Sequence, residues 1–305
     1  MTMRKRFFRW LRIIAIGLVG LIALLAAGVY IASELRLNRI YTINAEPLTI
    51  PNDPATIVRG QHVTVTRGGC RECHGANLAG KVLSDDPLIG RVVAPNLTRG
   101  KGGVGGEHTD ADWVRAIRHA IDEDGKPLRV MPVDDYQRLA ADDLAAIIAY
   151  VKSVPPVDSD LPPSQIGPLG RVLLVVNAAP LLPAEHADHT RPIPGPVPAG
   201  VTVAYGQYLA ATSGCISCHG PGLSGGPIPG TPPDWPPASN ITPSGWISTW
   251  SEADFFRALR EGKRPGGAPI SAVMPWRNSA QMTDDELRAL LAYLRSVPAK
   301  PYGGR

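Results

Sequence analysis

Four cysteines, the full complement of this 305-residue chain, fall into two short motifs. The motifs are Cys70-Arg71-Glu72-Cys73-His74 and Cys215-Ile216-Ser217-Cys218-His219. Two thiols at this spacing can form thioether bonds to the two vinyl groups on one edge of a haem, and the histidine that follows can ligate the iron. Because both copies are complete and share their downstream sequence, the chain predicts two covalently attached haem c groups.

Other uses of paired cysteines fit less well. A zinc site with four thiolates would have to join pairs that lie 145 residues apart, and each pair carries an adjacent histidine. A redox-active Cys-x-x-Cys of the thioredoxin type needs a βαβ context, whereas the flanks here are rich in glycine. A disulfide such as Cys70 to Cys218 is compatible with the cysteine count alone and stays open at this stage.

A low-spin haem that carries electrons needs a second axial ligand, and methionine sulfur raises its reduction potential. Met131 lies 57 residues after His74, and Met274 lies 55 residues after His219. Proline follows each methionine. The matched placement predicts Met131 and Met274 as the second ligands, so we expect the iron ligands to be His74 and Met131 in one site and His219 and Met274 in the other.

The remaining methionine and histidine candidates lack this matched placement. Met282 aligns with Leu139 and is therefore predicted to be an apolar core residue. Three histidines have no histidine counterpart in the second half: His62, His108 and His119 align with Tyr208, Trp250 and Glu261. The last two, His186 and His189, fall in a proline-rich segment and are predicted to be solvated. Two histidine ligands to one iron are therefore disfavoured.

The second half of the chain repeats the first at an offset of 142–146 residues. The shared segments occur in the same order and include APNLT at 94–98 with ASNIT at 238–242, Met-Pro at 131–132 and 274–275, and LAAIIAYVKSVP at 144–155 with LRALLAYLRSVP at 287–298. The order predicts two homologous domains, at residues 55–157 and 200–300, each with its own haem.

Each copy is predicted to be a set of helices joined by long loops. A short helix enters each motif, at 56–66 and 202–212. An amphipathic helix follows at 109–121 and 251–261, with Thr109 and Ser251 as caps. The last helix begins near 141 or 283 and has apolar residues at i, i+3, i+4, i+7 spacing. The sequence therefore predicts an all-α protein.

The N-terminus has the pattern of a membrane anchor. Five basic residues occur within positions 1–12, and residues 13–32 carry no charge. Twenty apolar residues match the length of a bilayer-spanning helix, whereas a cleavable signal peptide has a shorter apolar stretch. Ala26-Ala27-Gly28 resembles a cleavage site, so cleavage stays open. The basic residues predict a cytoplasmic tail at 1–12, an inner-membrane anchor at 13–32, a connecting segment at 33–54, and haem domains in the periplasm.

A linker is predicted between the copies, at 158–199, and a short tail at 301–305. Eleven prolines between 155 and 198 favour semi-rigid, extended stretches. One apolar patch inside the linker, residues 171–176, is predicted to pack on one of the haem domains. The whole chain has a net charge of +4, but without the five basic residues of the first 12 it has 26 basic and 27 acidic side chains. No basic footprint for nucleic acid is left.

Two polar features of the repeat are given structural interpretations. Asn96 and Asn240 begin Asn-x-Thr triplets that fit a glycosylation pattern, but both occupy the same repeat position. A local hydrogen bond from side chain to backbone is the favoured interpretation. Acids at 142, 143, 284 and 285 lie at helix N-termini, where the helix dipole favours them. They are not predicted to be catalytic.

The order of these segments resembles class I cytochrome c domains. More narrowly, it is similar to the cytochrome subunits of membrane-bound bacterial alcohol and gluconate dehydrogenases. The resemblance covers residues 55–157 and 200–300 and implies haem ligation as above and electron transfer. Members of that dehydrogenase family usually carry three haem domains and accompany a catalytic subunit, whereas this chain has two motifs and identifies no catalytic subunit.

The favoured hypothesis is a membrane-anchored dihaem cytochrome c, which is an electron carrier and not an enzyme. It would take electrons from a dehydrogenase or a quinol-oxidising complex and pass them to a soluble cytochrome or a terminal oxidase. Its partners would be redox proteins and the inner membrane, with no nucleic acid and no small-molecule substrate required. A dihaem peroxidase or oxidase is the alternative and would need a displaceable axial ligand. A sensing module is a third hypothesis, and the short predicted tail disfavours it.

Overall fold

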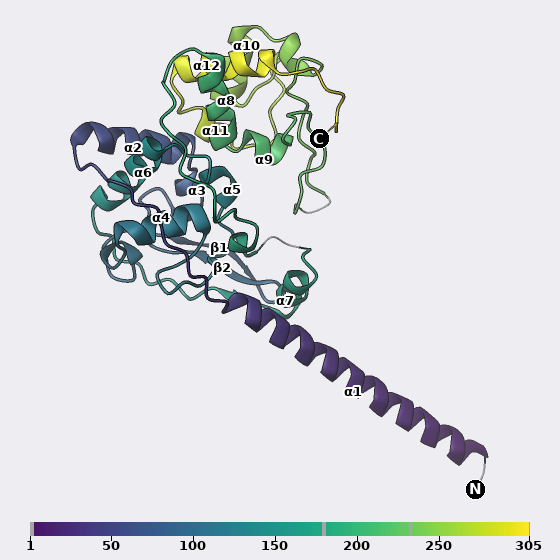
Figure 1. Ribbon diagram of the computed structural model, residues 1–305. Helices are drawn as coiled ribbons and strands as arrows, with labels where there is room; N and C mark the ends of the chain where they lie inside the picture. Colours follow the sequence, from purple (N-terminus) through teal and green to yellow (C-terminus); the bar gives the residue numbers. More distant parts are fainter. Residues whose placement is uncertain (1–2, 179–180, 232–233, 305) are drawn as a thin grey trace.

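The computed structural model describes residues 3–178, 181–231 and 234–304 (Figure 1). Residues 1–2, 179–180, 232–233 and 305, which belong to the predicted tails, linker and second domain, lie outside the described part. A long helix, α1 (Met3–Leu37), projects from a body that contains two helical units (Figure 1). The second unit lies at the end of the body opposite to α1 (Figure 1).

The first unit contains five α-helices and one short 3-10 helix: α2 (Pro54–Thr66), α3 (Cys70–His74), η1 (Val104–Gly106), α4 (Asp110–His119), α5 (Val133–Tyr136) and α6 (Ala141–Ser153). The second unit has the same series: α8 (Val203–Thr212), α9 (Cys215–His219), η3 (Trp246–Ser248), α10 (Glu252–Glu261), α11 (Trp276–Ser279) and α12 (Asp284–Ser296). Between them lie α7 (Pro168–Val175) and η2 (Pro183–Glu185). The predicted helices are thus confirmed, with ends shifted by one or two residues.

Local sequence explains where the amphipathic helices begin and end. The Thr109 hydroxyl accepts a hydrogen bond from the Asp112 backbone, and the Asp112 carboxylate accepts one from the Thr109 backbone. Ser251 and Asp254 make the same reciprocal pair at the start of α10. Such capping boxes satisfy backbone donors that a helix leaves unpaired. Gly262 ends α10 with φ +65°, a conformation that glycine adopts without a steric cost.

The prediction of an all-α protein is not confirmed, because two strands of the first unit and one strand of the linker form a three-stranded antiparallel sheet. The strands are β1 (Lys81–Asp86), β2 (Gly90–Ala94) and β3 (Gln165–Ile166), in the order β1-β2-β3. Asp86 shapes the hairpin by accepting hydrogen bonds from the backbones of Leu88 and Ile89, both at 2.8 Å. The corresponding part of the second unit is rich in proline, which cannot donate to a ladder, and its described residues show only the bridge between Gly226 and Ala238.

Each unit has its own apolar core, built where its first and last long helices cross. In the first unit, α2 packs on α6, and in the second α8 packs on α12. A Cβ atom built on Gly60 would lie 1.9 Å from the carbonyl oxygen of Ala146, and one built on Gly206 would lie 1.9 Å from that of Ala289. Only glycine permits so close an approach of two helix backbones, which explains why it recurs at this position.

The linker wraps around the first unit. Ser159 donates its backbone N–H to Lys101 at 3.0 Å, and Ala141 donates to Pro194 at 2.9 Å. The predicted apolar patch forms most of α7, and its Leu174 is buried with Leu37 of α1 and Ile166 of the sheet. The patch therefore packs on the first unit, as predicted, and also on α1, which was not predicted.

Within the described residues, one helix segment is long and apolar enough to cross a membrane by length and composition, namely Arg6–Leu37 of α1. Its large side chains are mostly exposed up to Ile31, and Ser33 and Leu37 are buried. The helix continues past Ala32 to Leu37 without a break, so the predicted connecting segment starts as helix.

The glycine crossing gives a stability prediction. Gly60→Ala should destabilise the folded protein by about 3 kcal/mol because the methyl group would overlap the Ala146 carbonyl, and overpacking has costs of this order. This loss corresponds to a decrease in Tm of ~10 °C or more. Thermal unfolding followed by circular dichroism measures it.

Gly106→Ala is the matched control, since a Cβ atom at Gly106 meets no atom within 4 Å. Its Tm should stay close to that of the wild type. Equal melting temperatures for Gly60→Ala and Gly106→Ala would show that α2 and α6 do not approach as closely as described.

Candidate haem sites

The first candidate site is a cavity of about 510 Å³ beside α3. Cys70, Cys73, His74 and Met131, the four residues predicted for the first haem, all line it. The rest of the lining is largely apolar and includes Leu97, Ile117, Leu128 and Ile147. A cavity of this size with an apolar lining and a few placed polar groups is typical of cofactor sites. The structure thus brings together residues that are up to 61 positions apart in the chain.

Both motif histidines are oriented by a backbone carbonyl. Nδ1 of His74 lies 2.8 Å from the carbonyl oxygen of Pro95, and Nδ1 of His219 lies 2.7 Å from that of Ser239. Because a carbonyl only accepts, the proton resides on Nδ1, and Nε2 keeps its lone pair for a metal. Burial lowers the pKa of His74, against the opposing effect of the Pro95 hydrogen bond. His74 is therefore neutral at pH 7, the form that binds iron.

The loops that supply these carbonyls are held by the repeated asparagines. The Asn96 side chain accepts from the Thr98 backbone at 2.9 Å and donates to the Val157 carbonyl at 2.7 Å. Asn240 makes the equivalent bonds to Thr242 and Lys300, at 2.9 and 2.8 Å. The predicted bond from side chain to backbone is confirmed in both copies, and it ties each loop to the chain just beyond the last helix.

The backbone takes the same unusual path after both motifs. Gly75 and Gly220 have φ values of +82° and +81°. Leu78 and Leu223 also have positive φ, +60° and +58°, although a leucine there is strained. Both leucines are buried. The shared conformation at equivalent positions shows that the two copies keep the same loop structure after the motif.

The cysteines do not form the alternative sites considered from sequence. None of the four is in a disulfide, so Cys70 and Cys218 are not joined. In the part of the chain that the structure describes, no three His, Cys, Asp or Glu side chains converge as for a metal ion. Burial raises the pKa of the Cys70 and Cys215 thiols to about 12. Thiols of this kind are poor redox nucleophiles.

Two buried nitrogen atoms in the first cavity also fit a haem. The indole Nε1 of Trp113 and the imidazole Nδ1 of His108 are buried and have no hydrogen-bond partner among the described residues, and both residues line the cavity. Haem carries two carboxylates that can accept from the Trp113 N–H, and from His108 in the tautomer that carries its proton on Nδ1. Buried donors are nearly always paired. Sequence reasoning assigned neither residue to the site, because His108 aligns with Trp250 and does not repeat as a histidine, and Trp113 aligns with Phe255 on an amphipathic helix.

The second unit places its predicted residues in the same surroundings. Cys215 and Met274 pack against its core, as Cys70 and Met131 pack against the core of the first unit. Met282 is buried inside that core with 1% of its surface exposed. The prediction that Met282 is a core residue is confirmed.

Comparison with known proteins identifies the family. The cytochrome c family profile matches residues 57–155 and 203–298. The chain belongs to the cytochrome c family. It is an electron-transfer protein that carries haem c, and the prediction of a carrier in place of an enzyme agrees with this assignment. Both matched regions lie inside the two predicted domains.

Similar proteins include cytochrome subunits of dehydrogenases. The cytochrome is 31% identical over 281 residues to "Alcohol dehydrogenase (quinone), cytochrome c subunit" of Gluconacetobacter polyoxogenes, covering 82% of this chain and 57% of the relative. It is 30% identical over 295 residues to "Fructose dehydrogenase cytochrome subunit" of Gluconobacter japonicus, covering 85% of this chain and 56% of the relative. The chain thus spans only about half the length of these relatives. A "Diheme cytochrome c-type" of Cereibacter sphaeroides is 28% identical over 92% of this chain and 97% of its own length.

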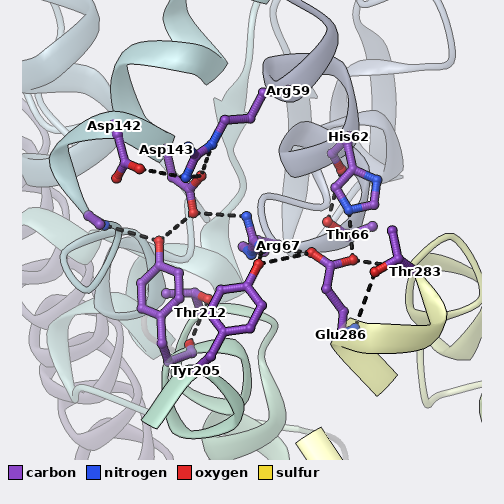
Figure 2. Close-up of polar contacts among 12 residues, drawn as sticks. Arg59, His62, Thr66, Arg67, Asp142, Asp143, Tyr205, Thr212, Thr283 and Glu286 are labelled. Carbon is purple, nitrogen blue, oxygen red and sulfur yellow. Dashed lines mark hydrogen bonds and ion pairs between the residues drawn. The ribbon is translucent and has the colours of Figure 1, made fainter. Parts of the chain in front are cut away.

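A buried ionic junction joins the two units of the cytochrome (Figure 2). The Arg67 guanidinium donates to Asp143 of α6 at 2.8 Å and to Glu286 of α12 at 2.7 Å. Tyr205 and Tyr208 of α8 complete the junction, with hydroxyls 2.6 Å from Arg67 and from Asp143 respectively. The side chains of Arg67 and Asp143 are 3% and 1% exposed. Asp143, interpreted from sequence as a helix-dipole acid, is therefore also an interdomain anchor.

At the junction, the attachment motif of each unit lies close to the other unit. Arg67 comes three residues before Cys70, so it anchors the approach to the first motif. Ser217, inside the second motif, donates to Asp135 of α5 at 2.6 Å. Because α5 begins two residues after Met131, the second attachment motif touches the segment that follows the first predicted methionine ligand.

The spare histidines lie outside the candidate sites, with the exception of His108. His62 is 2.8 Å from Glu286 at the junction. Nδ1 of His119 lies 3.1 Å from Nδ1 of His189. Burial lowers the pKa of His119 to about 4, and the neighbouring His189 adds to the effect. The prediction that His189 is solvated is wrong, because the linker folds back onto α4, whereas His186 is exposed as predicted.

The junction predicts a pH-dependent stability. Burial alone would raise the pKa of Glu286, but the His62 and Thr283 hydrogen bonds and the Arg67 charge lower it to about 2. A carboxylate with a depressed pKa stabilises the folded state above its ordinary pKa and loses this effect as the pH falls. Glu286→Gln should therefore be less stable than wild type by about 3 kcal/mol at pH 7, and the difference should narrow between about pH 5 and pH 2. Unfolding by guanidinium chloride at each pH in this range measures the difference in free energy of unfolding.

Glu261→Gln removes an exposed carboxylate at the end of α10 and controls for the change in net charge. Its stability should follow that of the wild type throughout. A gap between wild type and Glu286→Gln that stays constant with pH would contradict a role for the ionised Glu286 carboxylate.

Proposed function

We propose that this chain is a membrane-anchored dihaem cytochrome c that relays electrons in a periplasmic respiratory chain. One haem c would be attached at Cys70 and Cys73, with His74 and Met131 as iron ligands. The other would be attached at Cys215 and Cys218, with His219 and Met274 as ligands. When bound, each haem iron supplies one-electron redox chemistry, and the protein supplies ligands, an apolar pocket and fixed geometry.

The duplicated histidine geometry carries this proposal. In both units the motif histidine is held through Nδ1 by a carbonyl from the equivalent loop, within 0.1 Å of the same distance. A structural histidine in one unit alone would not need this repeated arrangement. The geometry supports one haem per unit and the domain bounds of 55–157 and 200–300.

The contacts between the units support transfer within the chain. The Arg67 junction and the hydrogen bond from Ser217 to Asp135 hold the two attachment motifs on facing parts of the units. A fixed arrangement acts as a high effective concentration of one redox centre at the other. An electron accepted by one unit would therefore pass to the other without a diffusional step.

The donor is proposed from the relatives. Two of them are cytochrome subunits of alcohol and fructose dehydrogenases, which favours a dehydrogenase as the source of electrons, with a quinol-oxidising complex as the other source. A soluble cytochrome or a terminal oxidase would accept the electrons. Helix α1 would span the inner membrane with its basic N-terminal residues in the cytoplasm, which leaves both units in the periplasm.

Carbon monoxide binding tests the ligand assignment and the function together. The reduced wild-type protein, with two haems counted by pyridine haemochrome, should bind no carbon monoxide because methionine closes each iron. Met131→Ala and Met274→Ala should each bind one equivalent per chain, and the double variant should bind two. Optical titration of the reduced protein measures the equivalents.

Met282→Leu is the matched control, because Met282 is buried in the second core and is not a proposed ligand. The Met282→Leu variant should bind no carbon monoxide. One equivalent bound by the wild type would overturn the relay in favour of a dihaem peroxidase or oxidase with a displaceable ligand. A haem content of one would overturn the dihaem assignment.

A further inference from the structure

The first observation concerns where the surface of the bilayer falls on α1. Between Arg12 and Glu34 the helix carries no charge. These 21 residues span about 31 Å at 1.5 Å per residue, which matches a hydrocarbon core of ~30 Å. Ser33 and Glu34 therefore mark the outer boundary of the apolar layer.

The second observation is that α7 is held at this level of α1. Arg171 of α7 donates to Ser33 and to Glu34, both at 2.6 Å, and its guanidinium lies 4.4 Å from the centre of the Tyr30 ring. In the other direction, Arg36 of α1 donates to the carbonyl of Leu174 at 2.5 Å. Figure 1 shows α7 beside the C-terminal end of α1. The contacts fix α7 to the segment where α1 leaves the apolar layer.

The third observation is an exposed apolar face on α7. Leu169 and Val172 of α7, and Val176, which caps its C-terminus, are 42%, 40% and 62% exposed. Their i, i+3, i+7 spacing places them on one side of the helix axis, and Leu174 points into the core with 1% exposed. The tip of the β1–β2 hairpin extends this face, because Leu169 donates its backbone N–H to the Leu88 carbonyl at 2.9 Å.

Leu88 and Ile89 at the hairpin tip are 59% and 42% exposed. Together with Leu169, Val172 and Val176 they form a patch of five large apolar residues, which we call the α7 patch. Patches of this kind on a protein surface mark a contact with a partner or a membrane. Tyr30 and Ile31 near the outer end of the membrane-spanning segment are 55% and 59% exposed, and the guanidinium of Arg171 in α7 lies over the Tyr30 ring.

We infer that the α7 patch rests in the outer leaflet of the membrane as an interfacial contact, in addition to α1. A short amphipathic segment can bury its apolar side in the boundary between headgroups and acyl chains. The inference rests on the proposed anchoring by α1, because α1 sets the level of the bilayer. Two contacts in place of one would stop the first unit from rotating about α1 and would fix which of its faces meets a soluble partner.

Photolabelling of the haem-loaded full-length protein tests the inference. The protein is reconstituted into phosphatidylcholine vesicles that contain a lipid with a diazirine near the headgroup, irradiated, and mapped by peptide mass spectrometry. Adducts are expected in α1, in α7 and at the hairpin tip. None is expected at Val58 of α2, an apolar side chain that is 65% exposed. Val172→Asp with Val176→Asp should abolish the α7 adducts and leave those in α1 unchanged.

The outcomes separate the two proposals. Adducts in α1 without adducts in α7 or the hairpin would overturn the inference, leave the anchoring intact and assign the patch to a protein partner. Absence of adducts in α1 would overturn the anchoring and, with it, the inference. Val58→Asp controls for added negative charge and should leave every adduct of the wild type in place.

Discussion

The relative position of the two units depends on one guanidinium group. Arg67 lies between Asp143 and Glu286, which occupy equivalent positions in the two halves of the repeat. Two carboxylates buried together without a cation would repel each other and would lose their hydration uncompensated. The two carboxylates also form hydrogen bonds with the side chains of Arg59, His62, Tyr205 and Tyr208. The ion group thus favours a single arrangement of the units over a range of loosely packed ones.

The contact between the units depends on residues that differ between the two copies of the domain. Arg59 and His62 of α2 correspond to Tyr205 and Tyr208 of α8. The first unit therefore supplies cations and imidazole, and the second supplies hydroxyls, to the same pair of equivalent carboxylates. Two copies of the first unit would bring cations against cations in this contact, and two copies of the second would leave the carboxylates without a cation. Divergence at these positions gives specificity through both attraction and repulsion.

Sequence reasoning succeeded where the information is local or repeated. The helices follow from apolar spacing and caps such as Thr109 and Ser251, which act within one turn. The pairing of Met131 with the first motif could be predicted only because Met274 recurs at nearly the same distance from the second motif. The family assignment rests on the same repeated order of segments.

The rest could not be predicted, because it depends on contacts distant in the chain. Arg67 and Glu286 are 219 residues apart, and nothing near either one indicates that the other completes its charge. Among the described residues the sheet has no counterpart in the second unit, so the repeat did not reveal it. Trp113 has the pattern of a core residue on an amphipathic helix, and its unpaired indole N–H becomes informative only once the cavity is known. His189 was misassigned because a proline-rich linker gives no sign of the surface onto which it folds.

These features place two fixed joints in series along the molecule. One joint lies where Arg36 and Arg171 tie α1 to α7 and the first unit, and the other is the Arg67 junction between the units. Domains joined only by a linker move relative to one another by default, and a relay with moving centres would wait for productive encounters. Charged side chains oppose that freedom at both joints, because separation would leave their charges unpaired. Arg67 and Asp143 are buried at the junction, whereas Arg36 and Arg171 are partly buried at the joint with α1. The ion pairs thus act together with apolar contacts at both joints, because Leu37 shares an apolar cluster with Leu174 and Ala140 shares one with Tyr205 and Tyr208.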